Sequence, residues 1–343
     1  MLSKGRFPTQ RKFIRCLHCW QHLTIFGGTD MTAARVTSPP EIQTIPSRVD
    51  GLPLSVEILA PDTGVQGVVQ ISHGMAEHKE RYEDFMAFLA QHGYAAVIHD
   101  HRGHGKSVRD PADLGYFYTE DSCAVTEDLY TVSAMIKARY PGLPLYLFSH
   151  SMGTLVARNY LKTHDDAVQK LVLCGPPTRN PAVDLAILLA RLSTKRKGPQ
   201  HRNLLLNRLA FGAAGKRFED PNGWLSSNAD AVDRYRQDPL CGYVFPNNGF
   251  LNLFQLLKGA YQTDGWRVSN PNLPIFLIAG ADDPIIQSKK KFEDLCQFFR
   301  QRGYQHISSK LYEGMRHELL NETEREQVYQ DILRFFDAHA DAL

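Results

Sequence analysis

Short apolar runs alternate with amphipathic stretches of about ten to fifteen residues along much of this chain. Residues 68–72, 94–99 and 145–148 are runs of strand length that are rich in β-branched, aliphatic or aromatic side chains. The segment between two of them, residues 82–92, places apolar side chains at helical spacing. Because parallel strands are joined by helical crossovers, this alternation predicts a mostly parallel central sheet flanked by helices on both faces.

The alternation is interrupted once, and the interruption sets the expected domain organisation. Residues 177–270 contain several Leu-rich stretches but no convincing strand, and strand-like runs resume at residues 275–278. We therefore expect one α/β core, made of residues 48–176 and 271–343, with residues 177–270 inserted as a helical cap. Two independent domains explain the pattern less well.

Residues 1–47 stand apart from this pattern. The first thirty residues carry five Lys and Arg against one acidic residue, and they lack the continuous apolar run of a secretory signal. We expect an N-terminal extension that is disordered, or a mis-assigned start with Met31 as the first residue. Cys16 and Cys19 have metal-ligand spacing, but no second pair of ligands follows at a suitable distance, so no metal site is predicted.

The composition excludes several classes of protein. A net charge of +2 over 343 residues gives no sign of nucleic-acid binding. The six cysteines are scattered, so a disulfide framework is not expected. No run of about 18 apolar residues is present, so no membrane span is predicted. We expect a cytoplasmic protein, with peripheral attachment to a membrane as the alternative, and the oligomeric state stays open.

Ser151 is the predicted nucleophile because it stands between a strand-like run and a helix, in Leu145-Tyr-Leu-Phe-Ser-His-Ser-Met-Gly153. A tight turn at this junction presents a serine hydroxyl at the carboxyl edge of a sheet, where a base can remove its proton. Small residues are needed two positions on either side, because the strand and the helix pass close together. Gly153 meets this need, and Ser149 stands where the commoner motif has glycine.

Two later loops supply an acid and a base. Asp283 follows the apolar run at residues 275–279, and a carboxylate there can orient a histidine ring and stabilise its charged form. Asp282 is adjacent, so residue type alone leaves the choice of acid open. His317 follows the last strand-like run, and its charged neighbours predict an exposed loop in which it acts as general base for Ser151. The order Ser, Asp, His along the chain resembles that of the α/β-hydrolases.

Acyl transfer by such a serine also needs hydrogen-bond donors for the oxyanion that forms during attack. The usual pair is the N–H of the residue after the nucleophile, here Met152, and an N–H from the loop after an earlier strand. His73-Gly74-Met75 occupies that loop. The backbone N–H groups of Met75 and Met152 are therefore the predicted oxyanion hole.

Five stretches of the chain carry a closer family resemblance: His73-Gly-Met-Ala-Glu-His78-Lys-Glu-Arg81-Tyr82, Asp100-His-Arg-Gly-His-Gly105-Lys-Ser107, His150-Ser-Met-Gly153, Asp238-Pro-Leu-Cys-Gly-Tyr-Val-Phe245 and Tyr312-Glu-Gly-Met-Arg-His317-Glu-Leu-Leu-Asn-Glu322. With them the chain resembles the monoacylglycerol lipase and lysophospholipase-like branch of the α/β-hydrolases, particularly its bacterial members. The likeness covers about residues 48–340. It implies an enzyme without metal or cofactor that cleaves one fatty acyl ester from a glycerol-type head group, under a cap that receives the acyl chain.

The resemblance also bears on individual residues. It favours Asp283, three residues beyond Gly280, over Asp282 as the acid. It implies that Glu77 and Arg81 help to hold the head group of the substrate. From residue type alone, an ion pair near the start of a helix is an equal interpretation of Glu77 and Arg81.

Three alternatives in function stay open. A peptidase of the proline iminopeptidase type or a general carboxylesterase would use the same three residues, and a non-catalytic lipid-binding receptor would use only the pocket. Epoxide hydrolases and dehalogenases of this fold are disfavoured, because they place Asp where this chain has Ser151. The expected ligand is a small lipid ester. The apolar residues 183–192 of the cap would line an acyl tunnel, touch a lipid surface or pack onto the core.

Overall fold

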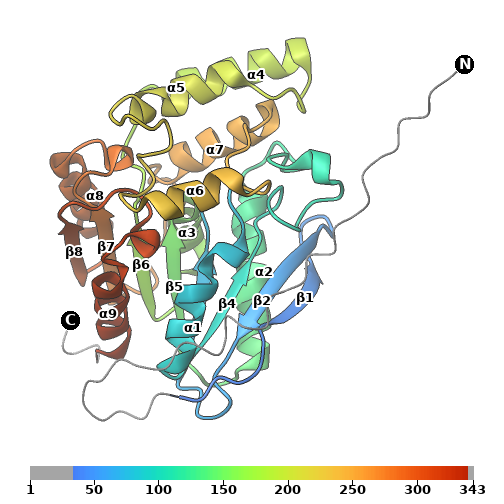
Figure 1. The fold of residues 1–343 in the computed structure, drawn as a ribbon. Helices are drawn as coiled ribbons and strands as arrows, with labels where there is room; N and C mark the ends of the chain where they lie inside the picture. Colours follow the sequence, from blue (N-terminus) through green and yellow to red (C-terminus); the bar gives the residue numbers. More distant parts are fainter. Residues whose placement is uncertain (1–33, 339–343) are drawn as a thin grey trace, which may run out of the picture. The chain divides into compact units, whose positions relative to one another are not determined.

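A computed structural model describes residues 34–338, which form one eight-stranded sheet flanked by helices (Figure 1). The strands lie across the sheet in the order β1-β2-β4-β3-β5-β6-β7-β8. β2 is antiparallel to both of its neighbours, and all other pairs are parallel, which confirms the predicted sheet. The strands are Glu41–Pro46 (β1), Pro53–Leu59 (β2), Gly67–Ser72 (β3), Tyr94–His99 (β4), Leu145–His150 (β5), Lys170–Cys174 (β6), Ile275–Gly280 (β7) and Ile307–Tyr312 (β8).

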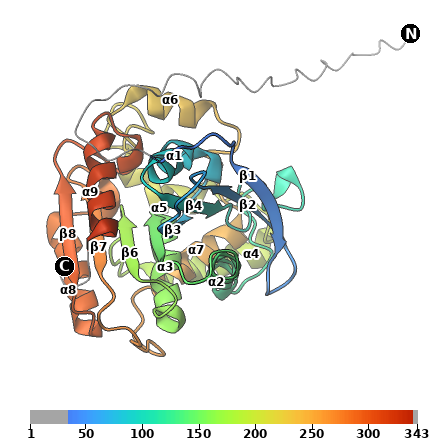
Figure 2. The same cartoon turned by 90° about the horizontal axis from the view of Figure 1, so that it is seen from below.

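Helices cover both faces of the sheet (Figure 2). One face carries α1 (Glu83–Gln91) and α9 (Arg325–Asp337), and the other carries α2 (Cys123–Arg139), α3 (Met152–His164) and α8 (Lys289–Arg302). Each face has its own cluster of buried apolar side chains. Because both faces are covered, every residue of β3, β4 and β7 is buried, as is typical of parallel strands.

The first strand differs from the prediction. We predict residues 1–47 as an extension, but Glu41–Pro46 forms β1 and pairs along its whole length with β2. The residues of β1 are exposed or half-buried, because this edge of the sheet is covered less completely. A short edge segment of this kind gains its ladder hydrogen bonds only from its partner, so its own sequence is a weak signal. The predictions for Cys16, Cys19 and Met31 lie outside the described residues.

Four helices fill the stretch between β6 and β7, above the carboxyl ends of the parallel strands (Figure 1). They are α4 (Val183–Lys197), α5 (Leu204–Gly215), α6 (Ala229–Gln237) and α7 (Asn247–Gly259). Residues 175–274 are all described and contain no strand, which confirms the predicted helical insertion. None of the described helices is both long enough and apolar enough to cross a lipid bilayer.

The insertion is hydrogen-bonded to the loops at this end of the core. The backbone N–H of Gly242 donates to the carbonyl of Ala76 at 2.9 Å. The N–H of Glu318 donates to the carbonyl of Leu225 at 2.7 Å. Both core partners lie in loops that carry predicted site residues, so the insertion helps to determine the conformation of these loops.

Candidate active site

Ser151 forms the sharp turn between β5 and α3, at the carboxyl edge of the sheet. Its φ of 50° is positive, which is uncommon for a residue other than glycine and indicates strain held by the surrounding structure. A Cβ on Gly153 would lie only 2.1 Å from the carbonyl oxygen of Ser72, so glycine is required there. Ser149 is fully buried and donates its hydroxyl to the carbonyl of Val172 at 3.0 Å, so the departure from the commoner motif is accommodated.

Ser151, His317 and Asp283 lie in one hydrogen-bonded chain. The hydroxyl of Ser151 is 2.8 Å from Nε2 of His317, and Nδ1 of His317 is 2.8 Å from Oδ2 of Asp283. A carboxylate only accepts, so Nδ1 carries the ring proton and Nε2 is left to accept the serine proton. The second oxygen of Asp283 accepts the N–H of Ile285 at 2.8 Å, which fixes the carboxylate. Asp282 is exposed, and the structure brings Asp283 rather than Asp282 to the histidine.

His317 is buried, so the predicted exposed loop is wrong. Its side chain lies beside the rings of His150 and Trp224, with centroid distances of 4.8 and 5.1 Å, and only 2% of the residue is exposed. Trp224 comes from the insertion, which the local sequence around His317 does not reveal. Excluding water from the ring strengthens its hydrogen bonds to Ser151 and Asp283.

The predicted oxyanion donors flank the nucleophile. Met152 is the first residue of α3, so its N–H has no partner four residues earlier within the helix. Met75 lies in the loop after β3, and its N–H donates to no acceptor among the described residues. Both amides are available to an oxygen of a substrate, and their role as an oxyanion hole stays a prediction.

A cavity of about 450 Å³ lies over Ser151 and His317, between the core and the insertion. The insertion contributes apolar side chains to its wall, among them Phe211, Trp224 and Leu225. The core contributes the carboxylates of Glu77 and Glu318. The cavity therefore offers apolar surface and a polar region to one ligand beside the same serine.

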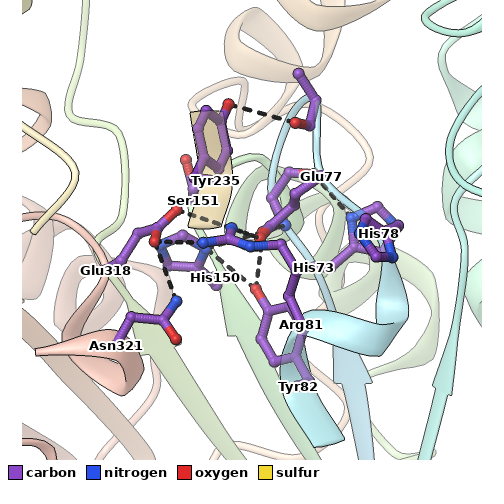
Figure 3. Close-up of polar contacts among 12 residues, drawn as sticks. His73, Glu77, His78, Arg81, Tyr82, His150, Ser151, Tyr235, Glu318 and Asn321 are labelled. Carbon is purple, nitrogen blue, oxygen red and sulfur yellow. Dashed lines mark hydrogen bonds and ion pairs between the residues drawn. The ribbon is translucent and has the colours of Figure 1, made fainter. Parts of the chain in front are cut away.

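Glu77 and Arg81 belong to a buried polar network next to Ser151 (Figure 3). Arg81 lies between two carboxylates: it pairs with Glu77 and donates to Glu318 at 2.9 and 2.6 Å. Its guanidinium also lies 4.9 Å from the ring centroid of Tyr235, in the insertion. The ion pair considered from residue type does form, and the role of Glu77 and Arg81 in head-group binding stays a prediction. Sequence reasoning missed Glu318, which is 237 residues from Arg81 along the chain.

Three members of this network are held in their charged forms. Burial disfavours the charge of Glu77, but Arg81 and then His150 outweigh it and hold the pKa of this carboxyl well below its usual value. Burial likewise disfavours the charge of His150, but hydrogen bonding to Glu77 outweighs it and raises the pKa of the imidazole. Burial opposes the charge of Arg81 too, and Glu318 and Glu77 raise its pKa well above the usual range.

A second cluster joins the core to the insertion. Among the described residues, one group has ligand-type side-chain atoms close enough to share a metal ion. It consists of His78, Asp238 and Cys241, whose ligand-type atoms all lie within 4.8 Å of one another. Both ring nitrogens of His78 already have partners, Glu80 at 2.7 Å and Asp238 at 2.8 Å. Burial opposes the charge, but Cys241, Glu80 and Asp238 together raise the pKa of His78 to about 11. Both ring nitrogens of His78 are therefore already used, and the His78–Asp238 contact is an ion pair between the core and the insertion.

The mostly parallel sheet, the helical insertion and the Ser–His–Asp chain at the carboxyl edge together define an α/β-hydrolase. This confirms the predicted fold class. Residues 63–324 match the family described as serine aminopeptidase, S33. The chain belongs to this family.

Its relatives include proteins named monoacylglycerol lipase or monoglyceride lipase. The chain is 25% identical over 294 residues to the monoacylglycerol lipase of Mycolicibacterium smegmatis, covering 85% of this chain and 95% of the relative. It is 29% identical over 278 residues to the monoglyceride lipase of Homo sapiens, covering 80% of this chain and 82% of the relative. A thermostable carboxyl esterase from Bacillus coagulans, solved in complex with glycerol, superposes with a TM-score of 0.81 at 27% identity, covering 88% of this chain and 99% of the esterase. The resemblance to monoacylglycerol lipases is confirmed.

Proposed function

We propose that this chain is a serine ester hydrolase that cleaves single-chain lipid esters, either monoacylglycerol or lysophospholipid. The observation that carries the proposal is the 2.8 Å contact between the Ser151 hydroxyl and Nε2 of His317, beneath a cavity with apolar walls. Similarity to monoacylglycerol lipases and to a carboxyl esterase supports an ester rather than another acyl substrate.

The geometry supports two acyl transfers in sequence. Ser151 attacks the ester carbonyl while Nε2 of His317 takes its proton, and Asp283 stabilises the imidazolium that results. The Met75 and Met152 N–H groups bind the oxyanion of the tetrahedral intermediate. His317 then gives the proton to the departing alkoxide, which leaves an acyl group on Ser151. Water, deprotonated by His317, attacks this acyl-enzyme and releases the fatty acid and the free serine.

The two kinds of cavity lining suit the two ends of such a lipid. Phe211, Trp224 and Leu225 supply apolar surface for the acyl chain. We assign the head group to the polar region where Glu77 and Glu318 face the cavity, with Arg81 bound to both carboxylates behind them. Arg81 and the charged His150 together balance the two carboxylates, so this region presents no uncompensated negative charge. This argues against an aminopeptidase, which needs a counter-ion for the free amino terminus of its substrate, although the family is described by that activity.

The insertion also carries a surface suited to a lipid membrane. Leu185, Leu188 and Leu192 on α4 and Leu204, Leu205 and Leu209 on α5 are each 48–65% exposed. Exposed basic residues accompany them: Arg191, Lys195, Arg196, Lys197 and Arg208. Exposed apolar side chains with nearby basic ones are typical of helices that lie on a bilayer. We propose peripheral membrane contact through this surface, called here the leucine face, as a route for a lipid substrate to the cavity.

The enzyme proposal is tested with a fluorophosphonate probe and a substrate panel. The wild-type protein should react covalently with the probe, Ser151→Ala should not, and the panel should show hydrolysis of monoacylglycerols or lysophospholipids above short p-nitrophenyl esters. Preference for the short esters would indicate a general carboxylesterase, and turnover of proline amides alone would indicate the peptidase. A folded protein that binds lipid but neither reacts with the probe nor turns over would be the receptor. Full esterase activity in Ser151→Ala would overturn the assignment of the nucleophile.

A further inference from the structure

Glu77 holds the loop that carries one predicted oxyanion donor, residues 73–76. Its Oε1 accepts the backbone N–H of Gly74 at 2.5 Å and the hydroxyl of Tyr82 at 2.8 Å. A Cβ on Gly74 would lie 2.6 Å from the same carboxylate oxygen. The loop is therefore folded directly against the Glu77 carboxylate, one peptide before the N–H of Met75.

His73 fixes the following peptide from the other side. The carbonyl of Gly74 belongs to the peptide unit that carries the Met75 N–H, and it lies 2.8 Å from Nδ1 of His73. The N–H of His101 donates to Nε2 of His73 at 2.9 Å, so the ring proton is on Nδ1 and is donated to Gly74. The orientation of the Met75 N–H thus depends on two side chains, Glu77 and His73.

His150 connects the same carboxylate to the general base. Its Nδ1 lies 3.3 Å from Oε1 of Glu77, and its Nε2 lies 3.3 Å from the backbone carbonyl of His317. An imidazolium donates at both nitrogens, so His150 can satisfy both contacts only when it is charged. The negative charge of Glu77 favours that form.

The oxygens of Glu77 have little capacity left for a substrate. Gly74, Tyr82 and His150 contact Oε1, and Arg81 contacts Oε2. Each carboxylate oxygen offers about two lone-pair positions, so Oε1 is fully occupied and Oε2 has about one position left beside Arg81. The residue is also only 3% exposed. A hydroxyl of the head group would have to displace one of these donors to reach Oε1, and the burial of Glu77 restricts access to Oε2.

We infer that Glu77 is a positioning residue, whose carboxylate fixes the Gly74–Met75 loop and, through His150, the main chain of His317. This inference rests on the proposed function and changes one part of it. The head group would then be contacted by Glu318, which lines the cavity, and Glu77 would act on the reaction with any ester.

Two esters of one fatty acid separate positioning from head-group binding. A monoacylglycerol offers hydroxyls to the polar region of the cavity, and the methyl ester of the same acid offers none. In Glu77→Gln we expect kcat to fall about 100-fold for both esters with little change in KM, because the oxyanion donor is misplaced. The rate of reaction with a fluorophosphonate, which has no glycerol group, should fall as well. A loss confined to the monoacylglycerol, or seen only in KM, would overturn the inference and restore Glu77 to the head-group site.

Glu318→Gln is the matched control. It removes the other carboxylate on Arg81 and leaves every contact of Glu77 in place. We expect it to affect the monoacylglycerol and to leave kcat for the methyl ester within about 3-fold. An equal loss of methyl-ester kcat in both variants would overturn the inference, because the charge balance of Arg81 would then explain it.

His150→Gln provides a second readout that does not require Glu77 to be changed. We expect a lower kcat for both esters and a changed pH–rate profile, because the positive charge of His150 is removed from beside the Ser151–His317 pair. Unchanged kcat and an unchanged profile would contradict the connection through His150. This test remains available if Glu77→Gln does not fold. Failure of the wild-type protein to react with either ester or with the probe would count against the proposed function, whereas defects among the variants bear on Glu77.

Discussion

The carboxylate of Asp283 lies 2.8 Å from Nδ1 of His317 and is buried with it. Asp282, its neighbour in sequence, is exposed to solvent. Asp283 contacts the histidine and Asp282 does not, so the same substitution can be compared at these two adjacent positions.

Asp283→Asn should lower kcat by roughly 10³- to 10⁴-fold, because an amide at this position stabilises the wrong tautomer of the histidine and does not stabilise its charged form. Asp282→Asn should leave kcat within about 3-fold, since that side chain lies outside the hydrogen-bonded chain. Steady-state hydrolysis of a monoacylglycerol by the two purified variants checks both statements. A large loss in Asp282→Asn with normal turnover in Asp283→Asn would show that the acid is wrongly assigned.

The positions of Ser151 and His317 in the fold could be predicted from the sequence because both depend on local signals. The run ending at Gly153 has the pattern of a buried strand, a turn and a helix, and Gly153 itself is required by the 2.1 Å approach of Ser72. His317 follows a strand whose length and composition are equally clear. The order of these segments along the chain then restricted the chemistry to the α/β-hydrolase type.

What the sequence could not provide are contacts between distant segments. Trp224 covers His317 although 93 residues separate them, so the charged neighbours of the histidine gave the wrong expectation of exposure. Glu318 pairs with Arg81 across 237 residues, and neither residue type predicts that partner. The strand Glu41–Pro46 depends on pairing with β2, and its edge position leaves few apolar side chains to mark it.

The buried carboxyl group of Glu57 should make the folded state less stable as the pH rises. The residue is 1% exposed in β2, neither carboxylate oxygen has a hydrogen-bond partner, and burial, together with Glu83, raises its pKa to about 7. The folded state therefore keeps a proton that the unfolded state loses above a pH of about 4.5. Stability conferred by the protonated form is lost between about pH 4.5 and 7 and stays lost at higher pH.

Glu57→Gln removes this dependence. We compare the free energy of unfolding of the variant with that of the wild type at pH 8.5 and at pH 4.5. The difference in favour of the variant should be larger at pH 8.5 than at pH 4.5, by about 3 kcal/mol. Urea unfolding at the two pH values measures the difference. Exposed Glu120→Gln controls for the loss of one surface carboxylate. An identical effect of Glu57→Gln at both pH values would contradict a buried, protonated Glu57.

A buried histidine group predicts the opposite dependence in acid. His99 has no hydrogen-bond partner on either ring nitrogen, and its ring lies 4.9 Å from that of His101. Burial lowers the pKa of His99 to about 3, so the folded state holds it neutral. The unfolded chain takes up a proton at His99 below a pH of about 6.5, so stability is lost as the pH falls from there toward 3.

His99→Leu should relieve this cost. The difference in free energy of unfolding between variant and wild type should favour the variant by about 2 kcal/mol more at pH 5 than at pH 7.5. The same change at exposed His201 controls for the loss of one ionisable group. Denaturant unfolding at both pH values is the measurement, and a pH-independent effect of His99→Leu would show that His99 is not neutral in the folded protein.

The leucine face predicts membrane binding that can be separated from catalysis. Leu204, Leu205 and Leu209 are 61–65% exposed on α5, and burying even part of each side chain in a bilayer contributes on the order of 1 kcal/mol. The triple change to Ser should weaken partitioning onto phosphatidylcholine vesicles at least ~10-fold, measured by co-sedimentation. It should also slow hydrolysis of monoacylglycerol embedded in vesicles and leave hydrolysis of a short water-soluble ester unchanged. Val49→Ser, at an apolar residue 49% exposed outside the insertion, should alter neither. Vesicle binding that survives the triple change would exclude this surface as the membrane contact.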